Sequence, residues 1–208
     1  MNQAKIIPIK TNNAEQFINN SVWAFNLDPV NSWAYWDKAF SKEECERIIE
    51  IGNNKTKEQA KTRNEKLGKI RKSEISWLYP SPELDWAYQR MTDIITNLNN
   101  RFFQFDLFGA TEGFQFTKYT APGGNYGKHI DSAHGTLVRK LSFTLQLSEP
   151  ESYKGGELCL YLGEKAEVIK KDQGYVALFP SYVLHEVKPV TQGTRYSLVS
   201  WITGKPFK

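Results

Sequence analysis

Cysteine, histidine and long apolar runs are all scarce in this 208-residue chain, and each shortage excludes a class of protein. Two cysteines, Cys45 and Cys159, are too few for a disulfide scaffold or a zinc ribbon, so we expect both to behave as small hydrophobes. No run approaches the ~18 apolar residues of a membrane span, and the first residues lack the apolar segment of a secretory signal. We therefore expect a cytoplasmic protein that does not associate with membranes.

Histidine limits the chemistry directly, because any reaction that needs imidazole must use His129, His134 or His185. The rest of the composition is ordinary, with 40% hydrophobic residues, 24% charged residues and a formal net charge of +4. These values lie near the averages of globular proteins and exclude an obligately disordered chain. The length suits one domain with a buried core.

Two helices are predicted in the N-terminal half. The first begins at Ser41, whose hydroxyl can cap the helix while Glu44 completes a capping box, and Gly52 is a natural stop. The second begins with Ser81 as cap and Pro82 in the first turn. Its apolar residues recur at three- and four-residue steps, so one face is expected to pack inward: Leu84, Ala87, Tyr88, Met91, Ile94, Ile95 and Leu98.

From about residue 103 the sequence changes to short β-rich runs with turn signals between them. The runs cover residues 113–119, 140–147, 157–161, 175–179, 185–189 and 195–201, and turn signals lie at 122–124, 154–156, 172–174 and 192–193. Many short strands without intervening helices predict a jelly roll or a related antiparallel barrel.

The expected architecture is a single domain over residues 1–208, mostly β with flanking helices. An N-terminal arm (1–37) precedes a helical support region (38–102), whose helices brace a double-stranded β-helix, or jelly-roll, core (103–203). Residues 55–72 carry eight basic and two acidic side chains. A solvated surface loop is the favoured interpretation of this basic segment, and a loop that contacts substrate is the alternative.

One constellation of residues suggests metal chemistry. On an extended segment His129 and Asp131 face the same side while Ile130 points away, and a barrel can bring the distant His185 to the same interior point. Two histidines and one carboxylate form the facial triad of non-haem Fe(II) oxygenases. That triad leaves three adjacent metal positions open for a bidentate cosubstrate and dioxygen.

Arg195 strengthens this interpretation. It comes ten residues after His185, at the start of an apolar strand. A buried arginine that faces into a barrel needs an anionic partner, and the guanidinium group matches a ligand carboxylate with two parallel hydrogen bonds.

Several longer runs surround these positions. They read IRKSEISWL at 70–78, GNYGKHID at 124–131, RKLSFTLQLSEP at 139–150, YKGGEL at 153–158, LFPS at 178–181 and GTRY at 193–196. With Tyr119, they resemble the prolyl 4-hydroxylase-type 2-oxoglutarate/Fe(II) dioxygenases, and among these the small microbial and phage hydroxylases of the PKHD type. The resemblance covers about residues 38–203 and is most specific from 113 to 201.

The resemblance implies a role for each candidate residue. His129, Asp131 and His185 would be the catalytic iron ligands, Arg195 would bind the distal carboxylate of 2-oxoglutarate, and Tyr119 would contact that cosubstrate through its hydroxyl. For Tyr119 the cosubstrate contact is the favoured interpretation, and a core residue is the alternative.

Three further positions follow from the same resemblance. Gln146 falls where relatives often place another cosubstrate contact. Tyr126 and Trp201 match aromatic positions near the mouth, where the prime substrate would lie, although both could equally be packing residues.

His134 is expected on a loop or rim, outside the metal site.

The implied function is a dioxygenase that hydroxylates a substrate C–H bond, first of all in a peptidyl proline, and releases succinate and CO2. Its cofactors would be Fe(II), 2-oxoglutarate and O2, with ascorbate as reductant. A peptide or protein substrate is expected, a small molecule stays open, and nucleic acid is not expected. The alternatives are a nucleic-acid oxidative demethylase with the same chemistry and a catalytically silent jelly-roll binding module.

Overall fold

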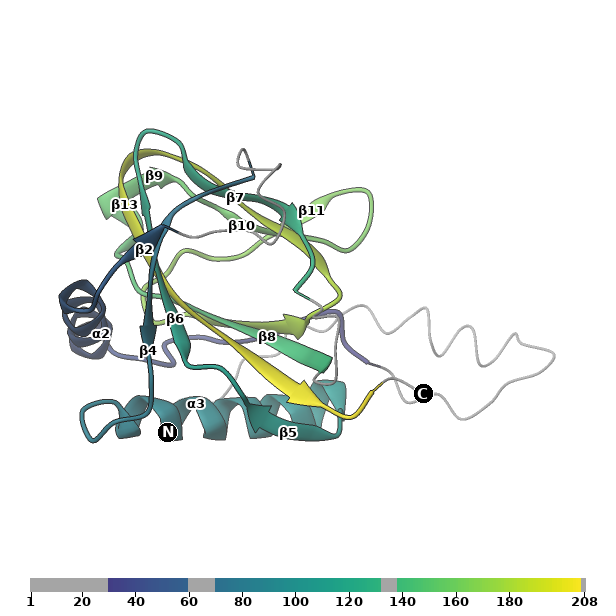
Figure 1. The fold of residues 1–208 in the computed structure, drawn as a ribbon. Helices are drawn as coiled ribbons and strands as arrows, with labels where there is room; N and C mark the ends of the chain where they lie inside the picture. Colours follow the sequence, from purple (N-terminus) through teal and green to yellow (C-terminus); the bar gives the residue numbers. More distant parts are fainter. Residues whose placement is uncertain (1–29, 60–69, 132–137, 207–208) are drawn as a thin grey trace.

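The computed structural model describes residues 30–59, 70–131 and 138–206, and these residues form two antiparallel sheets and two α-helices (Figure 1). The helices are α2 (Lys42–Asn54) and α3 (Asp85–Leu98), which a π-helical turn, η2 (Asn99–Phe103), extends. The strands are β1 (Ala34–Trp36), β2 (Glu58–Gln59), β3 (Arg71–Lys72), β4 (Glu74–Leu78), β5 (Leu107–Ala110), β6 (Phe114–Thr120), β7 (Gly124–His129), β8 (Val138–Gln146), β9 (Tyr153–Gly155), β10 (Leu158–Tyr161), β11 (Ala166–Val168), β12 (Val176–Pro180) and β13 (Leu184–Gly204), with a short 3-10 helix, η3 (Pro150–Ser152), before β9. The predicted mostly β fold with flanking helices is confirmed.

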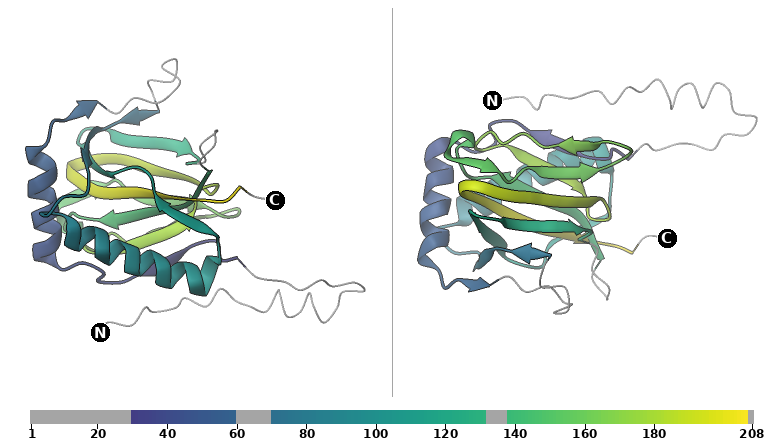
Figure 2. Two further views of the ribbon diagram at one scale, coloured as in Figure 1. Left: turned by 60° about the horizontal axis from the view of Figure 1, so that its bottom comes forward. Right: turned by 90° about the horizontal axis from the view of Figure 1, so that it is seen from above.

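The two sheets share one strand. In the helix-side sheet the strand order is β1-β12-β8-β13-β6-β4-β2, and in the covering sheet it is β11-β10-β13-β7-β3. The first half of β13 pairs with β10, β7 and β9, and its second half pairs with β6, β8 and β5. The covering sheet therefore lies over one face of the helix-side sheet, and α3 lies on the other (Figure 1). Figure 2 shows α2 along one end of both sheets.

The continuity of β13 corrects one prediction. The turn signal at Gln192-Gly193 predicted two separate strands, but a single strand runs from Leu184 to Gly204. Gly193 adopts a φ of 70°, and a Cβ there would lie 2.2 Å from the Ser152 carbonyl oxygen. The glycine therefore bends the strand against its neighbour instead of ending it, which lets β13 pass from one sheet to the other.

The first helix ends later than expected, and the second begins later than expected. The capping box of Ser41 and Glu44 is confirmed, but α2 continues past Gly52 to Asn54. Gly52 faces the Phe116 ring so closely that a Cβ would lie 2.4 Å from it, so this glycine serves packing. The second helix begins at Asp85, not at Ser81, because the Ser81 carbonyl accepts hydrogen bonds in a separate preceding turn.

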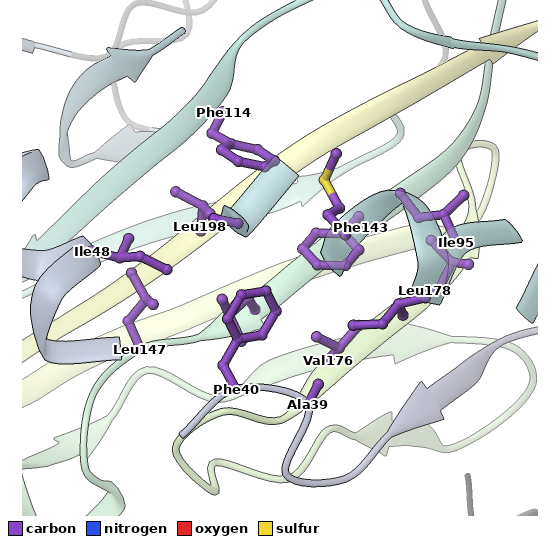
Figure 3. Close-up of a cluster of buried hydrophobic side chains, with 14 of the residues drawn as sticks. Ala39, Phe40, Ile48, Ile95, Phe114, Phe143, Leu147, Val176, Leu178 and Leu198 are labelled. Carbon is purple, nitrogen blue, oxygen red and sulfur yellow. The ribbon is translucent and has the colours of Figure 1, made fainter. Parts of the chain in front are cut away.

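The main hydrophobic core lies between the helices and the helix-side sheet (Figure 3). Apolar residues alternate along each strand, so that β8 points Leu141, Phe143 and Leu145 at the helices, and all three are fully buried. The helices contribute Ile48 and Ile95 to the same cluster. This core fixes the helix-side sheet in place, and the opposite face of that sheet is left for a site.

The support region contributes more than helices. Strands β2, β3 and β4 extend both sheets, although the sequence predicted no strand there. Most of the N-terminal arm (residues 1–29) and residues 60–69 of the basic segment lie outside the described residues. In the part of the chain that the structure describes, no helix is both long enough and apolar enough to cross a membrane.

Candidate functional site

The structure brings His129, Asp131 and His185 together. His129 ends β7 and pairs directly with His185 on β13, while Asp131 follows two residues later. The Nε2 atom of His129 lies 3.5 Å from Asp131 Oδ1, and that of His185 lies 3.4 Å from Oδ2. One potential ligand atom from each residue lies within 4.8 Å of the others. Ile130 is half exposed, as the predicted alternation requires.

The backbone fixes which imidazole nitrogen faces the centre. The Nδ1 atom of His129 lies 2.8 Å from the Gly127 carbonyl oxygen, and that of His185 lies 2.9 Å from the Val183 carbonyl oxygen. Because a carbonyl oxygen only accepts hydrogen bonds, each Nδ1 carries the proton. Both Nε2 lone pairs therefore face Asp131, the arrangement that metal-binding histidines adopt.

Three electron-pair donors that face one another need a positive charge between them. Burial raises the pKa of Asp131, but hydrogen bonding and attraction to the two histidines outweigh burial and hold that pKa well below its ordinary value. Burial lowers the pKa of His185, yet the same interactions with Asp131 leave it raised. Both shifts arise from the attraction between Asp131 and the histidines when these carry a second proton, and a divalent metal ion would supply positive charge in place of that proton.

The donor set fits a metal ion. Ligand atoms at adjacent positions, about 2.1 Å from one ion, lie roughly 3 Å apart, close to the separations seen here. Two imidazoles and one carboxylate on one side of an ion make up the facial triad of non-haem Fe(II) sites and leave adjacent positions open. The residues present therefore fit iron(II).

A hydrogen-bond network holds Asp131 in position. The Ser142 hydroxyl donates to Asp131 Oδ2 at 2.8 Å and lies 3.0 Å from the Ser181 hydroxyl. The Asp131 amide donates to the Ser181 carbonyl at 2.9 Å. All three residues are buried. The carboxylate is therefore oriented by two elements, β8 and the turn after β12, before any ligand binds.

The three residues border a cavity between the two sheets. Arg195, Ser197, Val199 and Trp201 line it at alternate positions of β13. Arg195 and Trp201 are six residues apart, roughly 20 Å along an extended strand, so the cavity has two distinct ends. Trp201 pairs across the sheet with Ser142, which places the triad at its end of the cavity.

Arg195 occupies the other end and is only 1% exposed. It donates from Nη2 to Gln146 Oε1 at 2.8 Å and from Nη1 to Ser197 Oγ at 3.3 Å. Its Nε–H has no hydrogen-bond partner, and it forms no ion pair with any carboxylate of the described residues. Burying a guanidinium group that contacts only neutral groups costs free energy. A ligand carboxylate that pairs with Arg195 would offset this cost.

The other predicted site residues fall into two groups. Tyr119, 3% exposed, lines the cavity with its ring 5.2 Å from the Arg195 guanidinium carbon, and Tyr126 and Trp201 line it as well. The Tyr126 ring stacks on His129, with centroids 3.5 Å apart. Gln146 is different, because its carbonyl oxygen holds Arg195. His134 lies outside the described residues.

Several cavity residues were missed by the sequence reasoning. Ser142 and Ser181 orient Asp131, and Arg71 and Gln115 line the cavity on the side of β3 and β6. Ser142 lies inside the RKLSFTLQLSEP run, where polar residues alternate with apolar ones. This alternation was the signal in the sequence that the strand has one polar face. A polar face of a strand normally contacts solvent, but here the covering sheet buries it.

Comparison with known proteins agrees with this geometry. Residues 114–203 match the profile of the 2OG-Fe(II) oxygenase superfamily. A PKHD-type hydroxylase from one strain of Prochlorococcus marinus is 44% identical over 99 residues, which cover 47% of this chain and 44% of the relative. Another, from Prochlorococcus marinus (strain NATL2A), is 41% identical over 117 residues, covering 54% of this chain and 52% of the relative. The chain thus spans about half the length of the curated relatives that it matches.

Solved structures share the fold. A Pseudomonas putida prolyl-4-hydroxylase superposes with a TM-score of 0.64 and 23% identity, covering 84% of this chain and 94% of that one. A Trichoplax adhaerens prolyl hydroxylase, in complex with a peptide fragment of hypoxia inducible factor, gives a TM-score of 0.70 and 19% identity, covering 91% and 86% of the two chains. At these identities the likeness shows the fold alone.

Proposed function

We propose that this chain, whose residues 114–203 match the profile of the 2OG-Fe(II) oxygenase superfamily, is an Fe(II)- and 2-oxoglutarate-dependent hydroxylase of peptidyl proline. One observation carries the proposal: three metal-ligand side chains converge at one end of a cavity whose other end holds a buried arginine without a carboxylate partner. A molecule that chelates a metal at one end and carries a carboxylate at the other fits this cavity. 2-Oxoglutarate is such a molecule.

Each residue has a task in this reaction. His129, Asp131 and His185 would hold the ion at the cavity. Iron(II) held there would supply the oxidative chemistry by which 2-oxoglutarate and O2 give succinate and CO2 while one oxygen atom enters a substrate C–H bond. Ascorbate would keep the iron reduced.

The opposite end of the cavity orients the cosubstrate. Arg195 receives the distal carboxylate, and Gln146 and Ser197 keep its guanidinium group pointed at that position. Tyr119 lies beside the same group, where its hydroxyl can donate to the cosubstrate. Apolar walls such as Leu158 exclude water from the reacting atoms.

A peptide substrate is the finer part of the proposal. It is supported by the shared fold of two prolyl hydroxylases, one of which binds a peptide. Trp201, whose buried Nε1–H has no hydrogen-bond partner, and Tyr126 line the cavity on the metal side, where that peptide would lie. A nucleic-acid demethylase and a silent binding module are the competing outcomes of the tests below.

The first test measures succinate formation from 2-oxoglutarate with Fe(II), O2 and ascorbate. We expect turnover in the wild-type chain, and none in Asp131→Ala or His185→Ala while circular dichroism shows both variants folded. His134→Ala, which removes the remaining histidine, is the control and should keep activity. If the wild type shows neither turnover nor Mn(II)-dependent binding of 2-oxoglutarate, the enzyme proposal is wrong and the binding module is favoured.

The second test addresses the substrate. A library of proline-centred peptides and a set of alkylated single-stranded DNA oligonucleotides are incubated separately with the active enzyme and analysed by mass spectrometry. We expect peptides to gain the mass of one oxygen atom on proline. Loss of the alkyl group from DNA, with unmodified peptides, would instead support the demethylase.

A further inference from the structure

A second arginine reaches the cavity. Arg71, on β3, donates from Nε to the Ser73 hydroxyl at 2.9 Å and from Nη2 to Gln115 Oε1 at 2.7 Å. Its guanidinium carbon lies 4.4 Å from the centre of the Tyr126 ring. All three partners are neutral, so the positive charge of Arg71 is oriented but not neutralised by them.

Other partly buried arginines of the described residues have carboxylate partners. Arg139 forms a bidentate pair with Glu112 at 2.6–2.9 Å, and Arg90 pairs with Glu44 at 2.6 Å. Within residues 30–59, 70–131 and 138–206, Arg71 has no such ion pair, although it lines the cavity. Arg195 shares this property, and its proposed partner is the cosubstrate. The charge of Arg71 is therefore available to a second ligand carboxylate.

The position of Arg71 separates its role from that of Arg195. Arg71 pairs across the sheet with Tyr126, whose ring stacks on the metal ligand His129. The guanidinium group and the imidazole thus both contact the Tyr126 ring beside the metal position. Arg195 is enclosed, whereas Arg71 is only half-buried and can meet a molecule that enters from solvent.

The surrounding charges favour one carboxylate over a polyanion. Lys118 pairs with Glu74 at 3.5 Å, and Arg139 is held by Glu112, so these two nearby cations are already neutralised. A nucleic-acid backbone would need several free cations in a row.

We infer that Arg71 binds a carboxylate of the prime substrate, so that the enzyme selects acidic peptides in which Asp or Glu stands near the hydroxylated proline. This inference rests on the proposed function. Gln115 and Ser73 hold the guanidinium group in its orientation, and Tyr126 covers one of its faces, so the group is preorganised for a planar carboxylate.

The experiment uses proline-centred peptides in sets of three that differ at one flanking position, which holds Asp, Asn or Lys. Each set places this variable position at a different distance from the proline. Wild type, Arg71→Gln and Arg71→Glu are loaded with Fe(II) and 2-oxoglutarate, and kcat/KM is measured for each peptide. We expect the wild type to prefer Asp over Asn at one position by about tenfold to a hundredfold, as a charge-assisted hydrogen bond implies. Arg71→Gln should lose that preference, and Arg71→Glu should prefer Lys.

Two further readouts isolate the substrate role. The KM for 2-oxoglutarate should be unchanged in Arg71→Gln, because Arg71 is assigned to the prime substrate and not to the cosubstrate. Lys72→Gln is the matched control: it removes the next cation on β3, whose Nζ donates to the Pro122 carbonyl, and should keep the acidic preference.

The outcomes separate this inference from the proposed function. If Arg71→Gln lowers turnover equally for acidic and neutral peptides, or weakens Mn(II) or 2-oxoglutarate binding, Arg71 only positions Tyr126 and His129 and the inference is wrong. Wild-type turnover without acidic preference, or with alkylated DNA as the modified substrate, also overturns it and leaves the oxygenase chemistry standing. If the wild type forms no succinate, the proposed function fails first.

Discussion

The helix-side sheet has two buried faces with opposite chemistry. On β8, Leu141, Phe143 and Leu145 face the helices, while the residues between them, Ser142 and Thr144, face the cavity. Strand β6 repeats the pattern, with apolar residues at Phe114 and Phe116 and polar ones at Gln115 and Thr117. Every one of these side chains is at most 6% exposed. Neighbouring residues on one strand therefore experience two different interiors.

The helix-side face stabilises the fold, whereas the cavity-side face is arranged for binding. The helix-side face gains free energy from close packing and the burial of apolar surface. The cavity-side face carries hydroxyls, amides and a guanidinium group that cost free energy to bury and are held in place by hydrogen bonds. Changes on the helix-side face should therefore reduce stability, and changes on the cavity-side face should reduce binding with little loss of stability.

The largest stability effect is expected from Phe143→Ala on the helix-side face. Phe143 is fully buried in the main core, and truncating such a side chain costs about 3–5 kcal/mol. The free energy of unfolding from urea denaturation measures the loss. Thr144→Val, the next residue on β8, is the matched variant and should change that free energy by less than ~1 kcal/mol. Equal losses in the two variants would remove the distinction between the faces.

Arg195→Met should separate binding from stability most clearly. Removing a buried cation that pairs with a ligand carboxylate should weaken 2-oxoglutarate binding by about 2 kcal/mol or more, or at least about thirtyfold. The ligand-free protein should lose no stability, because an apolar side chain replaces an unpaired buried charge. Calorimetric titration and urea denaturation measure the two quantities.

Arg195→Lys is the conservative control for that experiment. It keeps the positive charge and should retain part of the affinity, although it loses the two-pronged geometry of the guanidinium group. If Arg195→Met unfolds the ligand-free protein, the arginine stabilises the fold itself, and the assignment of this face to binding is weakened.

The triad was predictable from sequence because its signal is local. His129 and Asp131 are two residues apart on an extended segment, and the alternation of strands places both on one side. His185 and Arg195 are ten residues apart on what is one continuous strand, so their spacing is also fixed by backbone geometry. The mostly β fold followed in the same way from short alternating runs.

The remaining parts of the site depend on contacts between distant segments. Arg71 reaches the cavity only because β3 pairs with β7, a register that no pattern within residues 70–78 specifies. Gly193 carried an ordinary turn signal, and only its close contact with Ser152 shows that it bends a strand. An alternation of polar and apolar residues such as that of β8 ordinarily indicates a solvent-facing surface, and the covering sheet that buries it here comes from other parts of the chain.

Ser142→Ala tests the cavity-side face at a single hydroxyl. Ser142 donates to Asp131 Oδ2 at 2.8 Å, and losing such a contact beside a metal ligand costs about tenfold to a hundredfold in metal affinity. Titration with Mn(II) measures that change. Ser200→Ala is the matched control, because Ser200 is equally buried on the helix-side face and its hydroxyl has no partner. It should keep metal affinity and gain stability, and a reversed result would contradict the assignment of the two faces.

The smallest effect concerns Gly52→Ala, which tests how tightly the helix-side face is packed. Alanine improves helix propensity by about 1 kcal/mol, but its Cβ would lie 2.4 Å from the buried Phe116 ring, and such overpacking costs about 1–3 kcal/mol. We expect a net loss of about 1 kcal/mol in the free energy of unfolding. Gly163→Ala, where a Cβ meets nothing within 4 Å, should be neutral or slightly stabilising. A gain in stability from Gly52→Ala would mean that the Phe116 ring moves freely, and close packing would then no longer distinguish the helix-side face from the cavity.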